Sequence, residues 1–133
     1  CSSDLHNILD SSNYYDTQEL LCGVDVLITD YSSLLWDMTL LNRPIFRYAS
    51  NPDIYQETER DFYLPYNDWP YPNAHTVEEL VEQISTYDEY FWLKRQKNYL
   101  NEMGSYEHGC SSKNAVKFIE SLVTEGISKG RKI

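Results

Sequence analysis

The sequence predicts an α/β fold in which a small parallel sheet is covered by helices. Helical and strand-like segments alternate over residues 18–48, which is the order of a layered fold whose parallel strands are joined by right-handed crossovers. The 133 residues, of which 41% are hydrophobic, are also enough for one domain with a buried core. We therefore expect residues 1–133 to form a single domain.

The first helix and strand cover residues 18–29. Residues 18–22 form a short helical pattern that ends at Gly23. Residues 24–29 (VDVLIT) are nearly continuous in apolar character, which is typical of a strand buried on both faces of a parallel sheet. Because Cys22 lies in the same apolar run, we expect it to be a small core residue.

The second helix and strand cover residues 34–48. Apolar side chains recur at helical spacing over residues 34–41, and residues 42–44 (NRP) end that helix because the position before a proline disfavours helical geometry. Residues 45–48 (IFRY) form the next strand. For Arg43, before this strand, a contact with a phosphate and a surface salt bridge both remain open.

The remaining chain predicts one irregular segment and three helices. Residues 49–75 hold four of the five prolines, and they form either a loop packed over the sheet edge or a wall of a ligand pocket. Helices follow over residues 76–86, which open with a capping box, 88–103 and 112–123. The side chains expected to point inward are Val77, Leu80, Val81 and Ile84 on the first helix and Val116, Ile119, Leu122 and Val123 on the last.

Composition limits the partners and the compartment. A formal net charge of −10 makes nucleic acid an unfavourable partner, and the basic cluster at residues 129–132 is either a solvated end or a weak contact with anionic lipid. The three cysteines form no CxxC pair, which fits a reducing cytoplasmic compartment. No stretch is long and apolar enough to span a bilayer, and no signal peptide is visible.

The residues best suited to bind a ligand follow the first strand. Thr29 and Asp30 end the strand, Ser32 and Ser33 follow, and a helix then begins. Ligands of open α/β sheets bind beyond the carboxyl ends of strands, and the backbone N–H groups of a helix start attract phosphate. Asp37, one helical turn beyond Ser33, has the chemistry to accept hydrogen bonds from ribose hydroxyls.

A purely structural interpretation of the same residues remains open. Ser32 or Ser33 would cap the helix, and Asp37 would complement the helix dipole. His75, His108 and Cys110 match no zinc spacing, so we expect neither a metal nor a cofactor.

Residues 29–33 (TDYSS), followed by Trp36-Asp37 and by residues 41–45 (LNRPI), closely resemble the CDP-glycerol glycerophosphotransferase family. These are the primases and polymerases of teichoic acid, and the resemblance extends from about residue 14 to about residue 122. It implies a GT-B-type fold in which this chain is the carboxy-terminal, Rossmann-like lobe that binds the donor nucleotide. It also implies that the chain is a fragment of a larger two-lobed transferase and is inactive in isolation.

The resemblance implies roles for particular residues. Ser32 and Ser33 would contact the donor diphosphate and Asp37 would lie near the donor, with Thr29, Asp30, Arg43 and Ser112 as secondary candidates. The reaction would transfer glycerol phosphate to an acceptor hydroxyl and expel CMP, with a histidine as general base or phosphate ligand. The family's histidines lie upstream, and His6, which precedes Asn7, does not match their motif. At the family's Asp-Gly-x-Ala-Ser element this chain has Gly109 and Ser112, but His108 replaces the acid.

Three functions therefore remain open. The first is the donor lobe of an enzyme that uses CDP-glycerol and a polymer or lipid-linked acceptor. That enzyme would work in the cytoplasm at the inner face of the plasma membrane, and its contact with the membrane would come from the missing portion. The second keeps the lobe but uses CDP-ribitol or a nucleotide sugar as donor. The third is a non-catalytic nucleotide-binding or interaction module.

Overall fold

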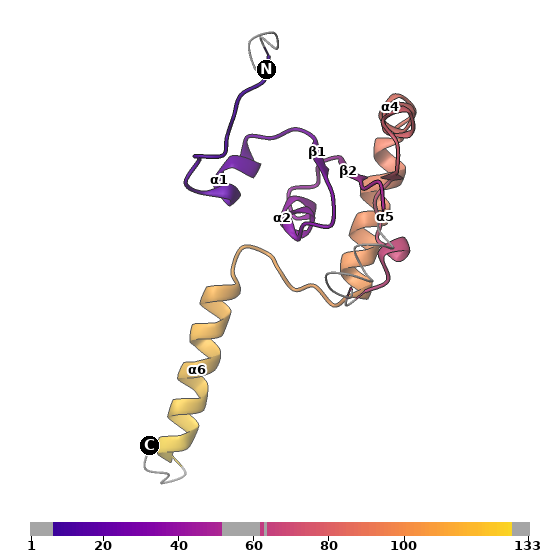
Figure 1. Cartoon of the computed structure of the whole chain (residues 1–133). Coiled ribbons are helices and arrows are strands. Elements are labelled where there is room, and N and C mark those ends of the chain that lie inside the picture. The colour runs from indigo at the N-terminus through magenta and orange to yellow at the C-terminus, as the bar shows by residue number, and fades with distance from the viewer. Residues whose placement is uncertain (1–6, 52–61, 63, 129–133) are drawn as a thin grey trace. The chain divides into compact units, whose positions relative to one another are not determined.

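A computed structural model describes residues 7–51, 62 and 64–128 of the chain. The chain divides into two compact units, residues 1–97 and residues 98–133, which are considered separately below. The first unit contains the sheet and most of the helices, so it determines where a ligand can bind (Figure 1).

Three parallel strands form the sheet, in the order β1-β2-β3. They are β1 (Leu27–Thr29), β2 (Ile45–Tyr48) and β3 (Asn73–Ala74). Leu27 pairs with Ile45 and Arg47 pairs with Asn73. The predicted α/β class and its parallel sheet are confirmed, although β3 lies inside the segment that was predicted to be irregular.

The helices agree closely with the predicted segments. Asp16 caps the first of them, because its carboxylate accepts hydrogen bonds from the backbone N–H groups of Gln18 (2.9 Å) and Glu19 (3.0 Å). None of the described helices is long and apolar enough to cross a bilayer. The helices are α1 (Thr17–Cys22), α2 (Leu34–Thr39), the 3₁₀ turn η1 (Tyr66–Asp68), α4 (Val77–Ser85), α5 (Glu89–Glu102) and α6 (Ser111–Ser128).

The core lies on the sheet face that carries Leu27 and Ile45. Helix α2 covers this face with Leu35 and Met38, which are fully buried. Beside α2 packs a group of side chains that we call the aromatic segment, consisting of Phe62, Leu64, Tyr66, Trp69 and Tyr71. Of the two interpretations of residues 49–75, the described part supports a loop packed on the sheet; residues 52–61 and 63 lie outside the described residues.

The opposite sheet face is only partly covered. Phe46 is buried there against Tyr87, with ring centres 4.9 Å apart, and α4 packs over β2 and β3. Over β1 nothing comparable lies in the described residues, so Val26 is 46% exposed and Ile28 is 49% exposed. The prediction that residues 24–29 are buried on both faces is therefore wrong for this structure.

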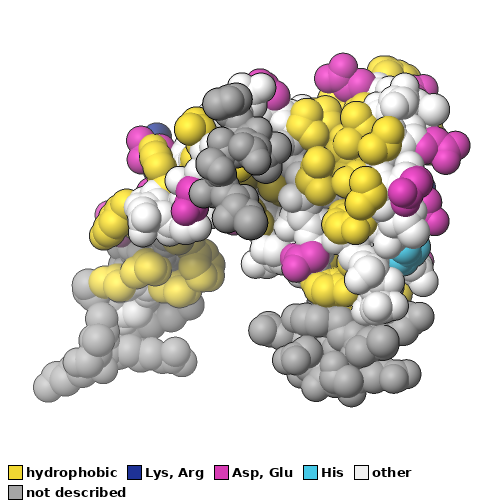
Figure 2. Space-filling view, turned by 45° about the horizontal axis from the view of Figure 1, so that its top comes forward, with side chains coloured by type: hydrophobic (Ala, Val, Ile, Leu, Met, Phe, Trp, Pro, Cys, Tyr) yellow, Lys and Arg dark blue, Asp and Glu magenta, His cyan; other side chains and the backbone are white. Residues whose placement is uncertain are grey.

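Two predicted apolar faces and one cysteine are also more exposed than expected. Val77, Val81 and Ile84 of α4 are exposed, and only Leu80 is half-buried; hydrophobic side chains gather on the surface shown in Figure 2. Cys22 is exposed because the helical register of α1 directs the neighbouring Leu21 into the core instead. All four side chains predicted to point inward from α6 are exposed, because the described part of the second unit contains, besides α6, only the last residues of α5 as helix.

The capping box of α4 gives a test of local stability. The Thr76 hydroxyl accepts a hydrogen bond from Glu79 N (3.2 Å), and the Glu79 carboxylate accepts one from Thr76 N (3.3 Å). We expect Thr76→Ala to lower the free energy of unfolding by about 1 kcal/mol in urea denaturation. Ser85→Ala is the control, since this exposed hydroxyl only bonds Val81 O in the same helix and its loss should be nearly neutral.

Tyr87 gives a test of pH dependence. Burial raises the pKa of Tyr87 to about 12, and its hydroxyl has no hydrogen-bond partner in the described residues. In the unfolded chain a tyrosine ionises near pH 10, so between about pH 10 and 12 the unfolded state releases a proton that the folded state retains. The corresponding stability is complete below pH 10 and is lost as the pH rises through 12.

We expect Tyr87→Phe to keep the free energy of unfolding within about 1 kcal/mol of the original at pH 8, because the lost hydroxyl is unpaired. Across the alkaline range this variant should lose less stability than the original protein. Tyr90→Phe, which alters an exposed ring, serves as the control in the same urea titrations. If the original protein and both variants lost the same free energy of unfolding at alkaline pH, ionisation of Tyr87 would not be the cause of that loss.

Candidate functional site

The candidate site is the turn that joins β1 to α2. Asp30 follows the strand, and its carboxylate accepts a hydrogen bond from Ser32 N (3.0 Å). The Ser32 hydroxyl in turn accepts from Leu34 N (3.3 Å), at the start of α2. These two local bonds fold the chain sharply at the carboxyl end of β1, as the sequence predicts for a strand-to-helix turn.

Ser33 and Asp37 are exposed polar residues whose side chains do not shape the turn. Ser33 is the residue before α2, yet its hydroxyl makes no capping bond. Asp37 lies one turn further along α2 and is also exposed. Ser32 therefore has the structural role that the alternative interpretation assigned to either serine, whereas the Ser33 hydroxyl remains available to a ligand.

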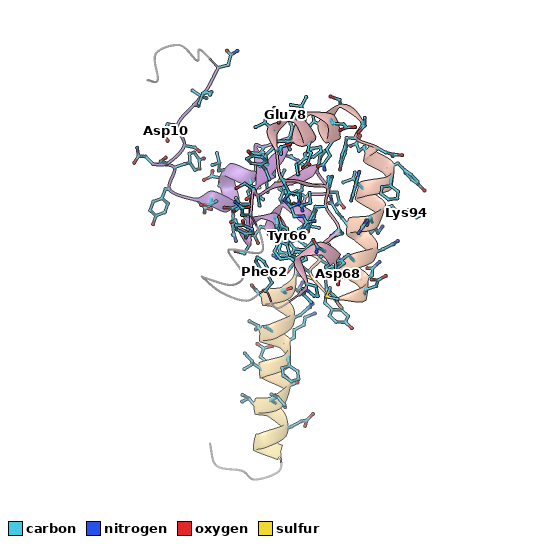
Figure 3. All side chains as sticks on the ribbon, turned by 45° about the vertical axis from the view of Figure 1, so that its right-hand side comes forward. Asp10, Phe62, Tyr66, Asp68, Glu78 and Lys94 are labelled. Carbon is cyan, nitrogen blue, oxygen red and sulfur yellow. The ribbon has the colours of Figure 1, made fainter. Side chains whose placement is uncertain are left out.

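The aromatic segment holds both sides of this site. The ring of Tyr31, inside the turn, lies 5.8 Å from that of Phe62 and 5.7 Å from that of Tyr66. The ring of Trp36, in α2, lies 5.3 Å from that of Trp69. Figure 3 shows Phe62 and Tyr66 side by side beneath the sheet. Since Tyr31 directly precedes the two serines and Trp36 directly precedes Asp37, packing of the aromatic segment sets where these polar groups lie.

Arg47 anchors the aromatic segment to the sheet, and sequence reasoning missed this role. Its side chain is only 2% exposed, and its guanidinium donates hydrogen bonds to the backbone carbonyls of Tyr66 and, at 3.2 Å, Tyr71. The guanidinium also lies 4.3 Å from the centre of the Tyr66 ring. Burial lowers the pKa of Arg47 below its ordinary value. An arginine within the apolar strand IFRY is the signal that could have indicated a buried anchor.

A second buried contact ties α2 to the aromatic segment. The Thr39 hydroxyl lies 2.5 Å from the Tyr71 hydroxyl and donates to Leu35 O at 2.6 Å, and Thr39 is 2% exposed. Because Thr39 donates to Leu35, the Tyr71 hydroxyl donates to Thr39. The end of α2 is thereby fixed against the same segment that holds the turn at its start.

The four secondary candidates for donor binding, Thr29, Asp30, Arg43 and Ser112, do not all lie at the same place in the structure. Thr29 is half-buried at the end of β1, next to Asp30. Arg43 donates a hydrogen bond to Val24 O, and both residues precede their strands, so Arg43 lies at the opposite edge of the sheet from the serines. Ser112 lies in the first turn of α6, in the second unit. Thr29 and Asp30 are therefore the secondary candidates that the structure brings together with Ser32 and Ser33.

A cavity of about 230 Å³ lies next to the start of β3. Tyr71 and Asn73, at the start of β3, line it together with Trp92 of α5. Tyr71, at the end of the aromatic segment, therefore forms part of a cavity wall as well as packing on the sheet.

His75 is held in a network at the carboxyl edge of the sheet. Its Nδ1 lies 2.9 Å from Ala49 O, and its Nε2 lies 3.2 Å from the side-chain amide of Asn73. The other end of that amide accepts a hydrogen bond from the Tyr66 hydroxyl at 3.0 Å. Both ring nitrogens of His75 thus lie within hydrogen-bond distance of a partner in this network.

The second unit contains a carboxylate next to the position where the resemblance led us to expect an acid. Glu107 accepts hydrogen bonds from the Ser111 hydroxyl and from Gly109 N, both at 2.6 Å. The bond from Ser111, followed by that from Gly109, holds the pKa of Glu107 below its ordinary value. Gly109 has φ 72°, a left-handed conformation that favours glycine. The acid therefore precedes His108 by one residue and closes the turn before α6.

Taken together, the turn and Ser33 offer hydroxyl and backbone donors, and Asp37 offers a carboxylate in addition to that of Asp30, which bonds Ser32 N. The donors suit the oxygens of a phosphate or diphosphate, and the carboxylate suits vicinal hydroxyls. No cluster of three or more histidine, cysteine, aspartate or glutamate side chains suited to a metal occurs among the described residues.

Residues 2–121 match the family described as CDP-Glycerol:Poly(glycerophosphate) glycerophosphotransferase. A teichoic acid ribitol-phosphate primase of Bacillus spizizenii is 34% identical over 120 residues, and a teichoic acid glycerol-phosphate primase of Bacillus subtilis is 34% identical over 119 residues. These matches cover 90% and 88% of the chain but only 30% of each relative. The chain thus spans about a third of the length of these curated relatives.

Solved structures agree with the sequence relatives. A structure of the wall teichoic acid polymerase TagF, in a variant soaked with CDPG, superimposes with a TM-score of 0.73 at 30% sequence identity. The match covers 96% of this chain and 32% of that one. Another TagF structure matches 99% of this chain with a TM-score of 0.71. The small parallel sheet with its helices is therefore the fold of the corresponding part of a GT-B-type transferase.

Replacement of Arg47 tests the anchor. We expect Arg47→Met to lower the free energy of unfolding by about 3 kcal/mol, because two buried carbonyls lose a charged donor while the apolar volume is largely kept. Arg43→Met, which removes one half-buried bond, should cost about 1 kcal/mol. Urea denaturation measures the free energy of unfolding of both variants. If the two replacements lower it equally, Arg47 contributes no more to stability than Arg43 does.

Proposed function

Because the chain belongs to the CDP-glycerol:poly(glycerophosphate) glycerophosphotransferase family, we propose that it supplies the donor-binding part of an enzyme of teichoic acid synthesis. The enzyme transfers glycerol phosphate from CDP-glycerol to a hydroxyl of a polymer or lipid-linked acceptor. The observation that carries this proposal is the exposed turn at the carboxyl end of β1, where the Ser33 hydroxyl makes no bond to its own helix.

The chemistry asked of this chain is mainly binding and orientation. In the reaction, an acceptor hydroxyl oxygen bonds to the β-phosphorus of the donor, and the bond from that phosphorus to the CMP oxygen breaks. CMP leaves, and the hydroxyl proton passes to a base. Ser33 and the backbone of the turn would hold the diphosphate, and Asp37 would hold the ribose hydroxyls. Because both nitrogens of His75 are engaged, we assign the base to a histidine beyond this chain.

CDP-ribitol is the second candidate donor. The ribitol-phosphate primase and the glycerol-phosphate primase are equally similar to this chain, at 34% identity. The described site contacts the shared CDP portion of the two donors, so it does not discriminate between their alcohols. A side-by-side measurement with both donors decides which alcohol is transferred.

We place the enzyme in the cytoplasm, at the inner face of the plasma membrane. An exposed free thiol, such as that of Cys22, persists in a reducing compartment. Nucleotide-activated donors and a lipid-linked acceptor meet at that face. The contact with the membrane would come from parts of the enzyme beyond this chain.

Ser33 is the sharpest probe of the proposed site. We expect Ser33→Ala to weaken binding of CDP-glycerol about tenfold or more, because a donor to a charged phosphate is lost, while stability stays unchanged because that hydroxyl caps nothing. Asp37→Asn should weaken binding of CDP-glycerol but leave binding of inorganic pyrophosphate intact. Titration calorimetry on the intact protein measures both.

Two matched variants separate binding from folding. Ser32→Ala removes a hydroxyl that Leu34 N uses, so it should lower stability as well as affinity. Ser85→Ala removes an exposed hydroxyl at the far end of α4 and should change neither the stability nor the affinity for CDP-glycerol. If Ser33→Ala and Ser85→Ala bind CDP-glycerol equally well, the donor site lies elsewhere. If no CDP-alcohol binds at all, the chain is a different kind of module.

A further inference from the structure

Within the described part of the first unit, the exposed positive charge is gathered on one helix. The sequence has no lysine or arginine before Arg43. Arg43 and Arg47 are half-buried and buried, and both donate to backbone carbonyls. Among the described residues of this unit, the exposed cations are Lys94, Arg95 and Lys97, which fall within one turn of α5.

These cations lie on the solvent side of α5. Gln96, which is 2% exposed, marks the buried side of the helix. At 100° per residue, Lys94 and Lys97 are separated from Gln96 by about 160° and 100°, so both point away from the unit. Figure 3 shows Lys94 projecting outward from the helix. Tyr90, one turn before Lys94, belongs to the same outward side.

Two aromatic rings extend this charged side of α5. Tyr90 is 76% exposed and Phe91 is 51% exposed. The Lys94 ammonium lies 5.7 Å from the centre of the Tyr90 ring, and the Arg95 guanidinium lies 5.4 Å from the centre of the Trp92 ring. A cation over a ring face keeps its charge and its remaining N–H donors, so it can still bind an anion.

We propose that the outward side of α5, formed by Tyr90, Phe91, Lys94, Arg95 and Lys97, is a docking surface for the polyol-phosphate chain of the acceptor. The inference rests on the proposed function, which supplies a polymer with one negative charge per repeat. Lys94 and Lys97 are neighbours on the helix surface, about 5–6 Å apart at Cβ, which is comparable to the spacing of phosphates joined through a three-carbon unit. The exposed rings would pack against the carbon atoms between phosphates.

Charge favours a linear polyanion over an anionic bilayer as the occupant. The chain has a net charge of −10, and Asp88 and Glu89 stand at the start of the same helix, one to two turns before Lys94. A bilayer is flat and would also meet acidic side chains of this strongly acidic surface. A polymer chain can follow the narrow basic strip. The strip also lacks the wide apolar face with which helices enter lipid. Of its five side chains, only Phe91 is fully apolar.

The test compares two pairs of exposed lysines. A fluorescent oligomer of glycerol phosphate, about ten units long, is titrated with the intact protein, and binding is followed by anisotropy. We expect K94Q/K97Q to weaken binding about tenfold at low salt and to reduce the slope of log affinity against log salt by about 1.4, the value for two lost phosphate contacts on a flexible strand. The control K113Q/K117Q removes the same charge from exposed positions on α6 and should weaken binding less than twofold.

The outcomes separate the possibilities. Equal effects of the two lysine pairs would mean that only net charge matters, and no effect of K94Q/K97Q would mean that α5 is not the site; either overturns the proposal. Binding of phosphatidylglycerol vesicles through Lys94 and Lys97 without binding of the oligomer would make α5 a membrane contact and would also overturn it.

Kinetics distinguish this proposal from the proposed function. In the full-length enzyme that contains this chain, we expect K94Q/K97Q to raise the KM for a polymeric acceptor while the KM for CDP-glycerol and the kcat stay unchanged, because α5 is not part of the donor site. If that full-length enzyme turns over neither CDP-glycerol nor CDP-ribitol, the proposed function fails. The anisotropy titration still decides whether α5 binds the polymer.

Discussion

The hydrogen bonds from Arg47 to the carbonyls of Tyr66 and Tyr71 are the interaction on which the rest of the structure depends. They fix the aromatic segment on the sheet, and that segment then provides the rings against which Tyr31 and Trp36 pack. Hydrogen bonds within the polar turn between β1 and α2 shape its backbone, and the aromatic segment packs against its Tyr31 ring. The position of the turn therefore depends on the guanidinium of Arg47, a residue that pairs with Thr29 in register.

Local sequence signals were sufficient for most of the fold but not for its edges. The alternation of helix and strand gave the parallel sheet, and the capping box located α4 within a residue. Strand β3 was missed because it is two residues long and follows Pro70 and Pro72, so neither its length nor its composition resembles a strand. The amphipathic patterns of α4 and α6 showed which side is apolar, but a pattern within one helix does not show whether that side is covered.

The candidate site divides in the same way. That a polar turn with two serines joins β1 to a helix could be predicted, because this needs only the order of residues and elements along the chain. The separate roles of Ser32 and Ser33 could not, since they depend on which hydroxyl meets Leu34 N. Arg43 and Arg47 look alike in sequence, yet one bonds at the amino edge and the other supports the core. Their partners lie 19 to 24 residues away along the chain, beyond any local pattern.

The two edge strands of the sheet, β1 and β3, differ in how their outer backbone groups are paired. At β3, the Gln83 side chain donates to Asn73 O at 2.6 Å, so the outermost strand has a side chain in place of a neighbour. At β1, the described strands leave the outer row of amide and carbonyl groups without a pairing strand. The sheet is consequently extensible in one direction only: an additional strand can join beside β1, whereas growth past β3 would require Gln83 to withdraw.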